Sequence, residues 1–168
     1  KLCSNLGLTS KEGDTLFAAY HNAIQYAAPT MDFYSKQALT TGHVRTILGR
    51  YSMFNLWESA EWADNEGKMP QPYHMAKHIF PGRQLRRART HNALNGVLQG
   101  SAADIFKTGI LKCWEDGIFD VTGVPMVLVH DELGMSDDGS KAADEAYREL
   151  VHTMETVIPL LVPVRVDE

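Results

Sequence analysis

The chain has 168 residues, of which 44% are hydrophobic and 22% charged, and its formal net charge is −5. This composition is typical of a folded globular chain and excludes a disordered tail. The negative net charge argues against a free-standing nucleic-acid-binding module, although a local basic patch could still bind nucleic acid. The apolar runs fall short of the roughly 18 residues of a membrane span. Cys3 and Cys113 are too few for a disulfide framework or a metal knuckle, so we expect a protein of a reducing cytoplasm. Because no apolar run is long enough for a span, we expect no membrane partner.

The N-terminal part predicts two helices. The letters TSKE at residues 9–12 have the spacing of a capping box and predict a helix over about residues 10–27, which Pro29 stops. Pro29 then suits the first turn of a second helix, and Gly42 is placed to end that helix in a left-handed conformation.

Extended and irregular structure is expected next. HVRTILGRYSMF, residues 43–54, predicts two short extended pieces that reverse at Gly49. Residues 55–83 show no sustained period and contain two tryptophans, three prolines and mixed charges, so they predict a long ordered loop and not a linker.

A long helix is predicted from the stretch that begins at Arg83. Leu94, Leu98 and Ile105 fall within about 40° of one another when each residue turns by about 100°, which predicts one core-facing stripe. The same stretch opens with Arg83, Arg86, Arg87 and Arg89, and four arginines in seven residues suit phosphate contacts, with Arg87 as our candidate for DNA binding. A solvated charged face is the alternative interpretation.

His91, Asn95 and Gln99 form a second stripe at i, i+4 and i+8 on the predicted helix. Gly96 and Gly100 lie beside it, each at a cost of about 1 kcal/mol relative to alanine. One interpretation is that another helix packs closely against the glycines while the amides cap local backbone. The other is a polar surface for the minor groove of DNA, whose acceptors are similarly placed in all four base pairs.

A hairpin is predicted further along. VPMVLV, residues 124–129, predicts a buried strand, and LGMS, residues 133–136, can return antiparallel to it. His130, Asp131 and Glu132 are therefore expected near the hairpin tip, where acidic side chains offer hard oxygen ligands for Mg²⁺. A solvated turn is the alternative.

The remaining residues predict a helix from about residue 140 to Pro159 and a final strand, LLVPVRVDE, over residues 160–168. The predicted class is α+β: a helical part, then a long helix, an antiparallel hairpin that carries His-Asp-Glu, a helix and a final strand.

The order of these motifs resembles a known family. LNGVLQGSAADIFK at residues 94–107, followed later by VHDEL at residues 129–133, resembles the palm of the family A DNA polymerases, the polymerase I type. Residues 6–51 look like the part of the fingers that follows the nucleotide-binding helix, and VPVRVDE looks like the last palm strand. The resemblance does not cover residues 55–83. The family often has an arginine where this chain has His91, whereas T7-like phage polymerases are similar to this chain in having histidine, which favours a phage or prophage origin.

The resemblance implies three parts. Residues 1–54 would be the C-terminal part of the fingers with the connection to the palm, residues 55–84 an irregular loop or insertion, and residues 85–168 the palm part with a DNA-contacting helix and the metal-site hairpin.

The resemblance also implies site residues and partners. Asp131 would be one of two aspartates that hold a catalytic Mg²⁺ pair, Glu132 would support that site, and His130 would lie near the primer terminus. Gln99 and Asn95 would touch the minor-groove side of a primer-template. The implied reaction is attack of the primer 3′-hydroxyl on the α-phosphate of a deoxynucleoside triphosphate.

The family's first metal aspartate, in a motif like DYSxIE, and its nucleotide-gripping helix do not occur in these 168 residues. We expect both in an N-terminal portion of the polymerase, either because the chain is a cut piece or because it is one product of a split gene, and we expect the chain alone to be inactive. Two other classes compete with this interpretation. One is a metal-dependent phosphohydrolase that uses His130 and Asp131, and the other is a non-catalytic module that binds DNA or a replication partner.

Overall fold

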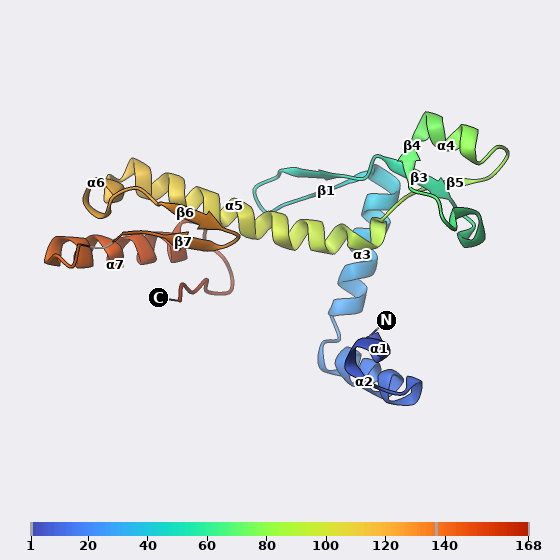
Figure 1. Ribbon diagram of the computed structural model, residues 1–168, viewed down its shortest axis with the longest axis horizontal. Helices are drawn as coiled ribbons and strands as arrows, with labels where there is room; N and C mark the ends of the chain where they lie inside the picture. Colours follow the sequence, from blue (N-terminus) through green and yellow to red (C-terminus); the bar gives the residue numbers. More distant parts are fainter. Residues whose placement is uncertain (1, 137, 168) are drawn as a thin grey trace. The chain divides into compact units, whose positions relative to one another are not determined.

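The structure, a computed structural model, describes residues 2–136 and 138–167 and consists of helices and small antiparallel sheets (Figure 1). The predicted mixed α+β class is confirmed. The chain divides into two compact units, the first made of the residues up to Arg45 together with Tyr51–Val97, and the second made of Thr46–Arg50 together with the residues from Leu98 onward. Among the described residues, no helix is both long enough and apolar enough to cross a bilayer.

Unit 1 begins with three helices, α1 (Leu2–Leu6), α2 (Ser10–Ala23) and α3 (Ala27–Thr41). The predicted capping box is confirmed, because the Thr9 amide donates to the Glu12 carboxylate at 2.8 Å and the Thr9 hydroxyl accepts from the Glu12 amide at 3.4 Å. Helix α2 ends a turn earlier than expected. Helix α3 ends at Gly42 as predicted, with φ at 80°.

The predicted reversal at Gly49 is also confirmed. Strands β1 (His43–Arg45) and β2 (Tyr51–Met53) pair antiparallel, and Gly49 lies between them with φ at +85°. A small core joins this hairpin to helix α3 and to the long helix α5 (Ala93–Glu115). It consists of buried Ala38, Val44 and Ala93 with Tyr34, Phe54 and Val97 packed against them.

Residues 55–83 were expected to be irregular, and this prediction is wrong. They contain β3 (Leu56–Ser59), a 3-10 turn η1 (Trp62–Asn65), β4 (Gln71–Pro72) and α4 (Tyr73–Ile79), and β5 (Leu85–Arg87) follows. The strands form a sheet of order β4-β3-β5, and α4 packs against β3. Strands of two to four residues are too short to show a period in the sequence. We call residues 56–87 the insert.

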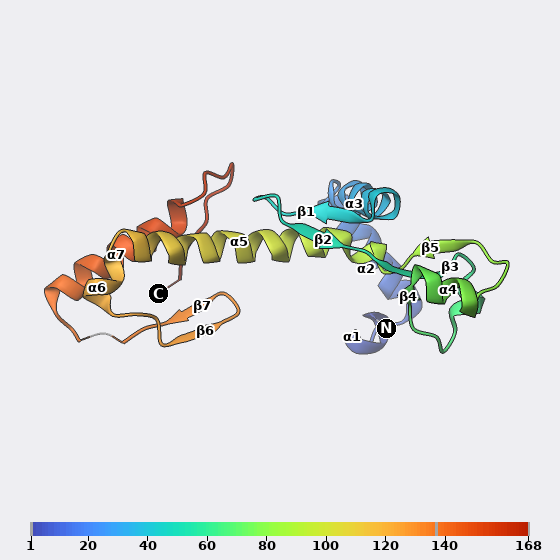
Figure 2. The ribbon, with the colours of Figure 1, turned by 90° about the horizontal axis from the view of Figure 1, so that it is seen from above.

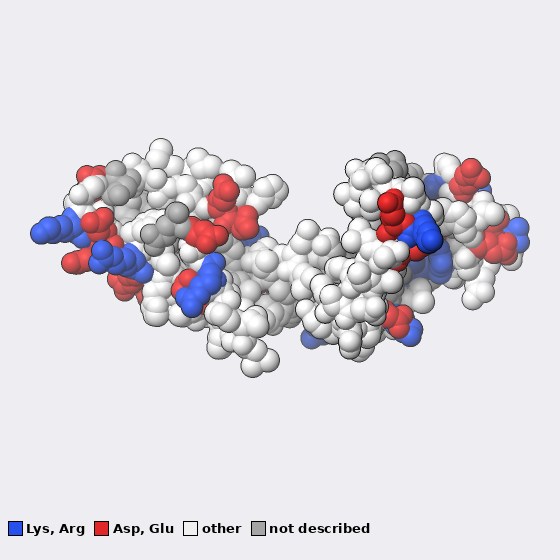
Figure 3. Space-filling model, turned by 90° about the horizontal axis from the view of Figure 1, so that it is seen from below, with Lys and Arg blue, Asp and Glu red and all other residues white. Residues whose placement is uncertain are grey.

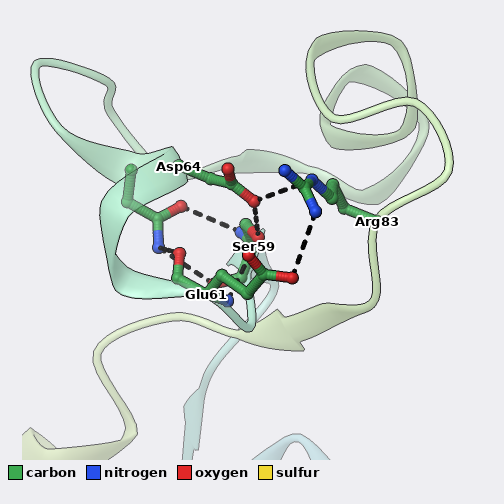
Figure 4. Close-up of polar contacts among 5 residues, drawn as sticks. Ser59, Glu61, Asp64 and Arg83 are labelled. Carbon is green, nitrogen blue, oxygen red and sulfur yellow. Dashed lines mark hydrogen bonds and ion pairs between the residues drawn. The ribbon is translucent and has the colours of Figure 1, made fainter.

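A polar network closes the turn after β3 (Figure 4). The fully buried Ser59 donates from its hydroxyl to Asp64 at 2.7 Å and from its amide to the Asn65 side chain at 2.9 Å. Arg83 reaches Glu61 and Asp64, each at 3.2 Å. These bonds satisfy a buried hydroxyl and amide, which explains why a segment of mixed charge is ordered.

The long helix α5 spans Ala93–Glu115, and it begins later than predicted because β5 and the 3-10 turn η2 (Thr90–Asn92) occupy its expected first turns. In unit 2 it is followed by α6 (Ile118–Thr122) and α7 (Lys141–Thr156). The core of unit 2 consists of Cys113, Ile118, Phe119, Ala146, Leu150 and Met154.

The predicted core-facing stripe of α5 is wrong. Leu98 is 60% exposed, whereas Asp104, Gly109 and Cys113 are buried. A side chain at Gly109 would collide with the Met154 sulfur of α7. The helix buries its small residues because neighbouring elements approach its backbone there, and close approach outweighs side-chain hydrophobicity.

The hairpin and the helix after it were predicted correctly, but two details were not. Strand β6 (Val127–Val129) pairs antiparallel with β7 (Glu132–Gly134), yet the three β6 side chains are 47% to 59% exposed and not buried. No strand occurs among the described residues 157–167, where we expected the last one; Glu168 lies outside the described residues. The Val166 amide donates instead to the Glu155 carboxylate at 3.1 Å, and prolines 159 and 163 have no amide to offer a neighbouring strand.

Two glycines of α5 allow the β1–β2 hairpin to lie against the helix. A Cβ at Gly96 would lie 3.0 Å from the Ser52 hydroxyl, and a Cβ at Gly100 would lie 2.6 Å from the Thr46 methyl group. The close-packing interpretation of the glycines is therefore correct, with a hairpin in place of the expected helix.

An ion pair fastens the turn of this hairpin to α5. Arg50 donates from Nε to Asp104 at 2.8 Å and from Nη2 to the Gly100 carbonyl at 2.9 Å. The Thr46 hydroxyl and then the Arg50 guanidinium lower the pKa of Asp104 against the effect of burial, which raises it. Because the pKa is lowered in the folded chain, this contact stabilises the fold at neutral pH and is lost only as the pH falls through the lowered value.

Gly100→Ala should destabilise the chain by about 1–3 kcal/mol, although alanine is the better helix former, because the new methyl group would overlap the buried Thr46. Urea unfolding followed by circular dichroism measures the difference. Gln99→Ala is the matched control on the next, exposed position and should leave the midpoint within about 0.5 kcal/mol of wild type. Equal stability of Gly100→Ala and wild type would contradict the close approach.

Candidate functional site

Strands β6 and β7 form a hairpin (Figure 2), and its tip carries the three ionisable residues. Val129 pairs with Glu132, so His130 and Asp131 form the two-residue turn and Glu132 is the first residue of β7. His130 has φ at 56°, a left-handed conformation that costs a side-chain-bearing residue roughly 1–2 kcal/mol. Asp131 therefore lies in the turn and outside the β6–β7 ladder, and it is exposed.

All three side chains are exposed, and none makes a hydrogen bond or an ion pair with another described residue. Asp131 and Glu132 therefore offer unneutralised carboxylate oxygens, the donor type that Mg²⁺ prefers. Across residues 2–136 and 138–167, however, no group of three or more His, Cys, Asp or Glu side chains is arranged to hold a metal ion. Asp131 and Glu132 could supply some of the ligands of a Mg²⁺ ion, but the described residues do not form a complete site.

Helix α5 presents Asn95 and Gln99 to solvent on adjacent turns. Neither amide bonds to any residue that the structure describes, so the interpretation that they cap local backbone is wrong. His91 is exposed as well, but it lies in η2 and not in α5 itself. The expected three-residue stripe on one helix therefore reduces to two amides, preceded by a histidine on a 3-10 turn.

The arginines do not form one uniform phosphate surface. Arg87 is half-buried, donates to the Phe54 carbonyl at 2.9 Å and lies 4.7 Å over the Trp57 ring. Arg86 pairs with Glu58 at 2.9 Å. Basic and acidic side chains lie next to one another on the face in Figure 3, and of the four arginines only Arg89 has no partner within the described chain.

Sequence reasoning missed the Arg50–Asp104 pair that positions α5. The two residues are 54 positions apart, and the sequence around either one does not indicate that it contacts the other. It also missed that Arg87 packs over Gly42, where a Cβ would lie 2.6 Å from the guanidinium carbon. Both contacts depend on tertiary structure.

Comparisons with known proteins agree with the motifs. The family described as DNA polymerase family A matches residues 1–168. A DNA-directed DNA polymerase of Pseudomonas phage M6 is 40% identical over 78 residues, which are 46% of this chain and 10% of that protein. DNA polymerase I of Deinococcus radiodurans is 29% identical over 177 residues, covering 99% of this chain and 15% of that protein.

A solved structure has the same fold. The polymerase domain of Pol1 from M. smegmatis, in complex with DNA primer-template and dNTP, superposes with a TM-score of 0.66 at 22% identity, covering 96% of this chain and 25% of that one. The chain spans only 10% to 16% of the length of the first curated relatives. With the family match extending from the first residue to the last, this chain belongs to DNA polymerase family A.

Proposed function

We propose that the chain is a portion of a template-directed DNA polymerase and that it contributes one metal-binding carboxylate and part of the primer-template surface. The observation that carries this proposal is that Asp131, on the two-residue turn of β6–β7, is exposed and pairs with none of the residues that the structure describes. Family membership supplies the reaction class, transfer of a deoxynucleotide to a primer.

The proposed roles at the hairpin follow from its geometry. Asp131 supplies anionic oxygens for Mg²⁺, and the left-handed turn at His130 holds that carboxylate at the tip. When bound, Mg²⁺ lowers the pKa of the attacking hydroxyl and neutralises charge on the transferring phosphate. We propose Glu132 as a secondary participant, because it is the first residue of β7 whereas Asp131 lies in the turn itself. His130 would lie near the primer terminus.

The proposed DNA surface is the exposed side of α5. Asn95 and Gln99 have free amide donors for minor-groove acceptors, which every base pair presents in similar positions. His91 would extend this row, and Arg87 retains guanidinium nitrogens beyond the one that binds Phe54 for a phosphate. Primer-template DNA and deoxynucleoside triphosphates are the partners we propose.

Catalysis would require the N-terminal portion of the polymerase, which we propose carries the other metal aspartate and the nucleotide-binding helix. Two findings support this. The described residues contain no complete metal-binding group, and the apolar side chains of β6 are about half exposed, as expected for a strand that packs against further protein.

The isolated chain should extend no primer, because one carboxylate corner cannot hold the two metal ions of nucleotidyl transfer. Adding the N-terminal portion as a separate chain should restore Mg²⁺-dependent synthesis. A gel-based primer-extension assay with each part alone and with both together measures this. Nucleotide incorporation by the purified 168-residue chain alone would contradict the proposal.

In the assembled enzyme, Gln99→Ala should weaken primer extension by roughly 1–3 kcal/mol in kcat/KM on every template sequence, because a minor-groove acceptor would lose its donor. The melting temperature should hardly change, since Gln99 is exposed and has no partner among the described residues. Extension kinetics on templates of different composition test the uniformity. Normal extension combined with a lowered melting temperature would show that Gln99 serves packing instead.

Asp131→Asn should reduce kcat of the assembled enzyme on the order of a thousandfold or more, because metal-ion stabilisation of the transition state is worth several kcal/mol. Duplex binding should survive, since phosphate contacts dominate affinity. Glu132→Gln is the matched variant and should have the smaller effect. Extension at several Mg²⁺ concentrations, with duplex affinity measured alongside, compares the two, and near-normal turnover in Asp131→Asn would leave the hairpin tip as a solvated turn.

A further inference from the structure

The insert carries an open cavity of about 730 Å³, and every residue that lines it belongs to the insert. The family model that matches residues 1–168 covers this segment, but the match by itself assigns no ligand to the cavity. A volume of this size falls in the range of small-molecule binding sites. The residues that line the cavity indicate which class of ligand it can bind.

Three aromatic side chains form one part of the lining. Tyr73 is 46% exposed and lies edge-on to Trp57, with ring centroids 4.9 Å apart. Phe80 is only 5% exposed and also lines the cavity. An exposed ring held edge-on by a second ring offers a surface against which a planar group can stack.

Two cations form another part. Lys77 lies with Nζ 5.1 Å from the centre of the Tyr73 ring and pairs with no carboxylate among the described residues. Glu61 and Asp64 hold Arg83 through Nη1 and Nε, so its orientation is fixed while Nη2 bonds to no described group (Figure 4). None of the described residues that line the cavity is acidic, and the two carboxylates that contact Arg83 lie outside the lining.

We propose that this cavity binds an unpaired nucleotide of single-stranded DNA, with the base against Tyr73 and the phosphate at Lys77 and Arg83. Proteins that bind single-stranded nucleic acid without sequence preference stack bases on aromatic side chains and contact the phosphates with lysine and arginine. In a duplex the base faces are covered by neighbouring bases, so a double strand cannot use the ring. The inference rests on the proposed function only for the presence of DNA.

Fluorescence anisotropy of a labelled oligodeoxythymidylate with the full chain, without Mg²⁺ or nucleotides, tests the proposal. Tyr73→Leu should raise Kd about tenfold through lost stacking. Lys77→Gln should raise Kd and reduce the slope of log K against log salt by about 0.7, the contribution of one phosphate contact on a single strand. Trp62→Leu, an exposed aromatic of the insert outside the cavity, is the matched control and should bind as wild type.

A second measurement does not depend on the stability of the Tyr73 variant. The double variant Trp62→Phe and Trp114→Phe leaves Trp57 as the only tryptophan, and both replaced side chains are exposed. Its emission should be quenched by the oligodeoxythymidylate and much less by a duplex of equal length, because a stacked base would lie beside Trp57.

Any one of four results would overturn the proposal. Two concern the variants: both cavity variants bind the oligonucleotide with wild-type affinity, or the oligonucleotide does not quench Trp57 emission. Two concern the ligand: the chain binds duplex as tightly as the single strand, or it binds a proline-rich peptide and not the oligonucleotide. These binding measurements do not depend on DNA synthesis. If the cavity proposal fails, the prediction of primer extension by the assembled enzyme still stands, and if primer extension fails, the binding result still stands.

Discussion

The close approach of the β1–β2 hairpin to α5 is the constraint on which the arrangement of the residues of the proposed DNA surface depends. Gly96 and Gly100 remove the side chains that would block it, and Arg50 bonds to Asp104 and to the Gly100 carbonyl across the contact. This contact determines which side of α5 is covered. Asn95 and Gln99 are left in solvent as a result, with their amide donors unused by the described chain.

The elements that could be predicted from sequence are those whose signals are local. The capping box at Thr9, the left-handed glycines at positions 42 and 49, and the two strands around residues 130–131 all lie within a few residues of the structure they determine. The insert could not be predicted, because its strands are short and pair over long separations. The prediction that Leu98 faces the core was wrong for a related reason, because tertiary contacts form on the glycine side of α5.

The candidate site divides in the same way. Sequence placed the acidic pair at a hairpin tip, and the family resemblance supplied its proposed role. The left-handed backbone of His130 and the stacking of Arg87 on Trp57 depend on neighbours distant in the chain or on turn geometry, so only the structure gave them. The four arginines are close together in the sequence, but the structure separates them by their contacts. Arg83 and Arg86 pair with carboxylates, Arg87 donates to a carbonyl, and Arg89 has no partner among the described residues.

The two ends of the insert lie side by side. Trp57 pairs with Arg87, and the Ala88 amide donates to the Leu56 carbonyl at 2.8 Å. A segment that leaves and re-enters the fold at adjacent points can change in length at little cost to the rest, because the backbone closes at the same place whatever lies between. The insert can therefore be shortened, lengthened or replaced between Leu56 and Ala88 without rebuilding the packing of α5 against the β1–β2 hairpin.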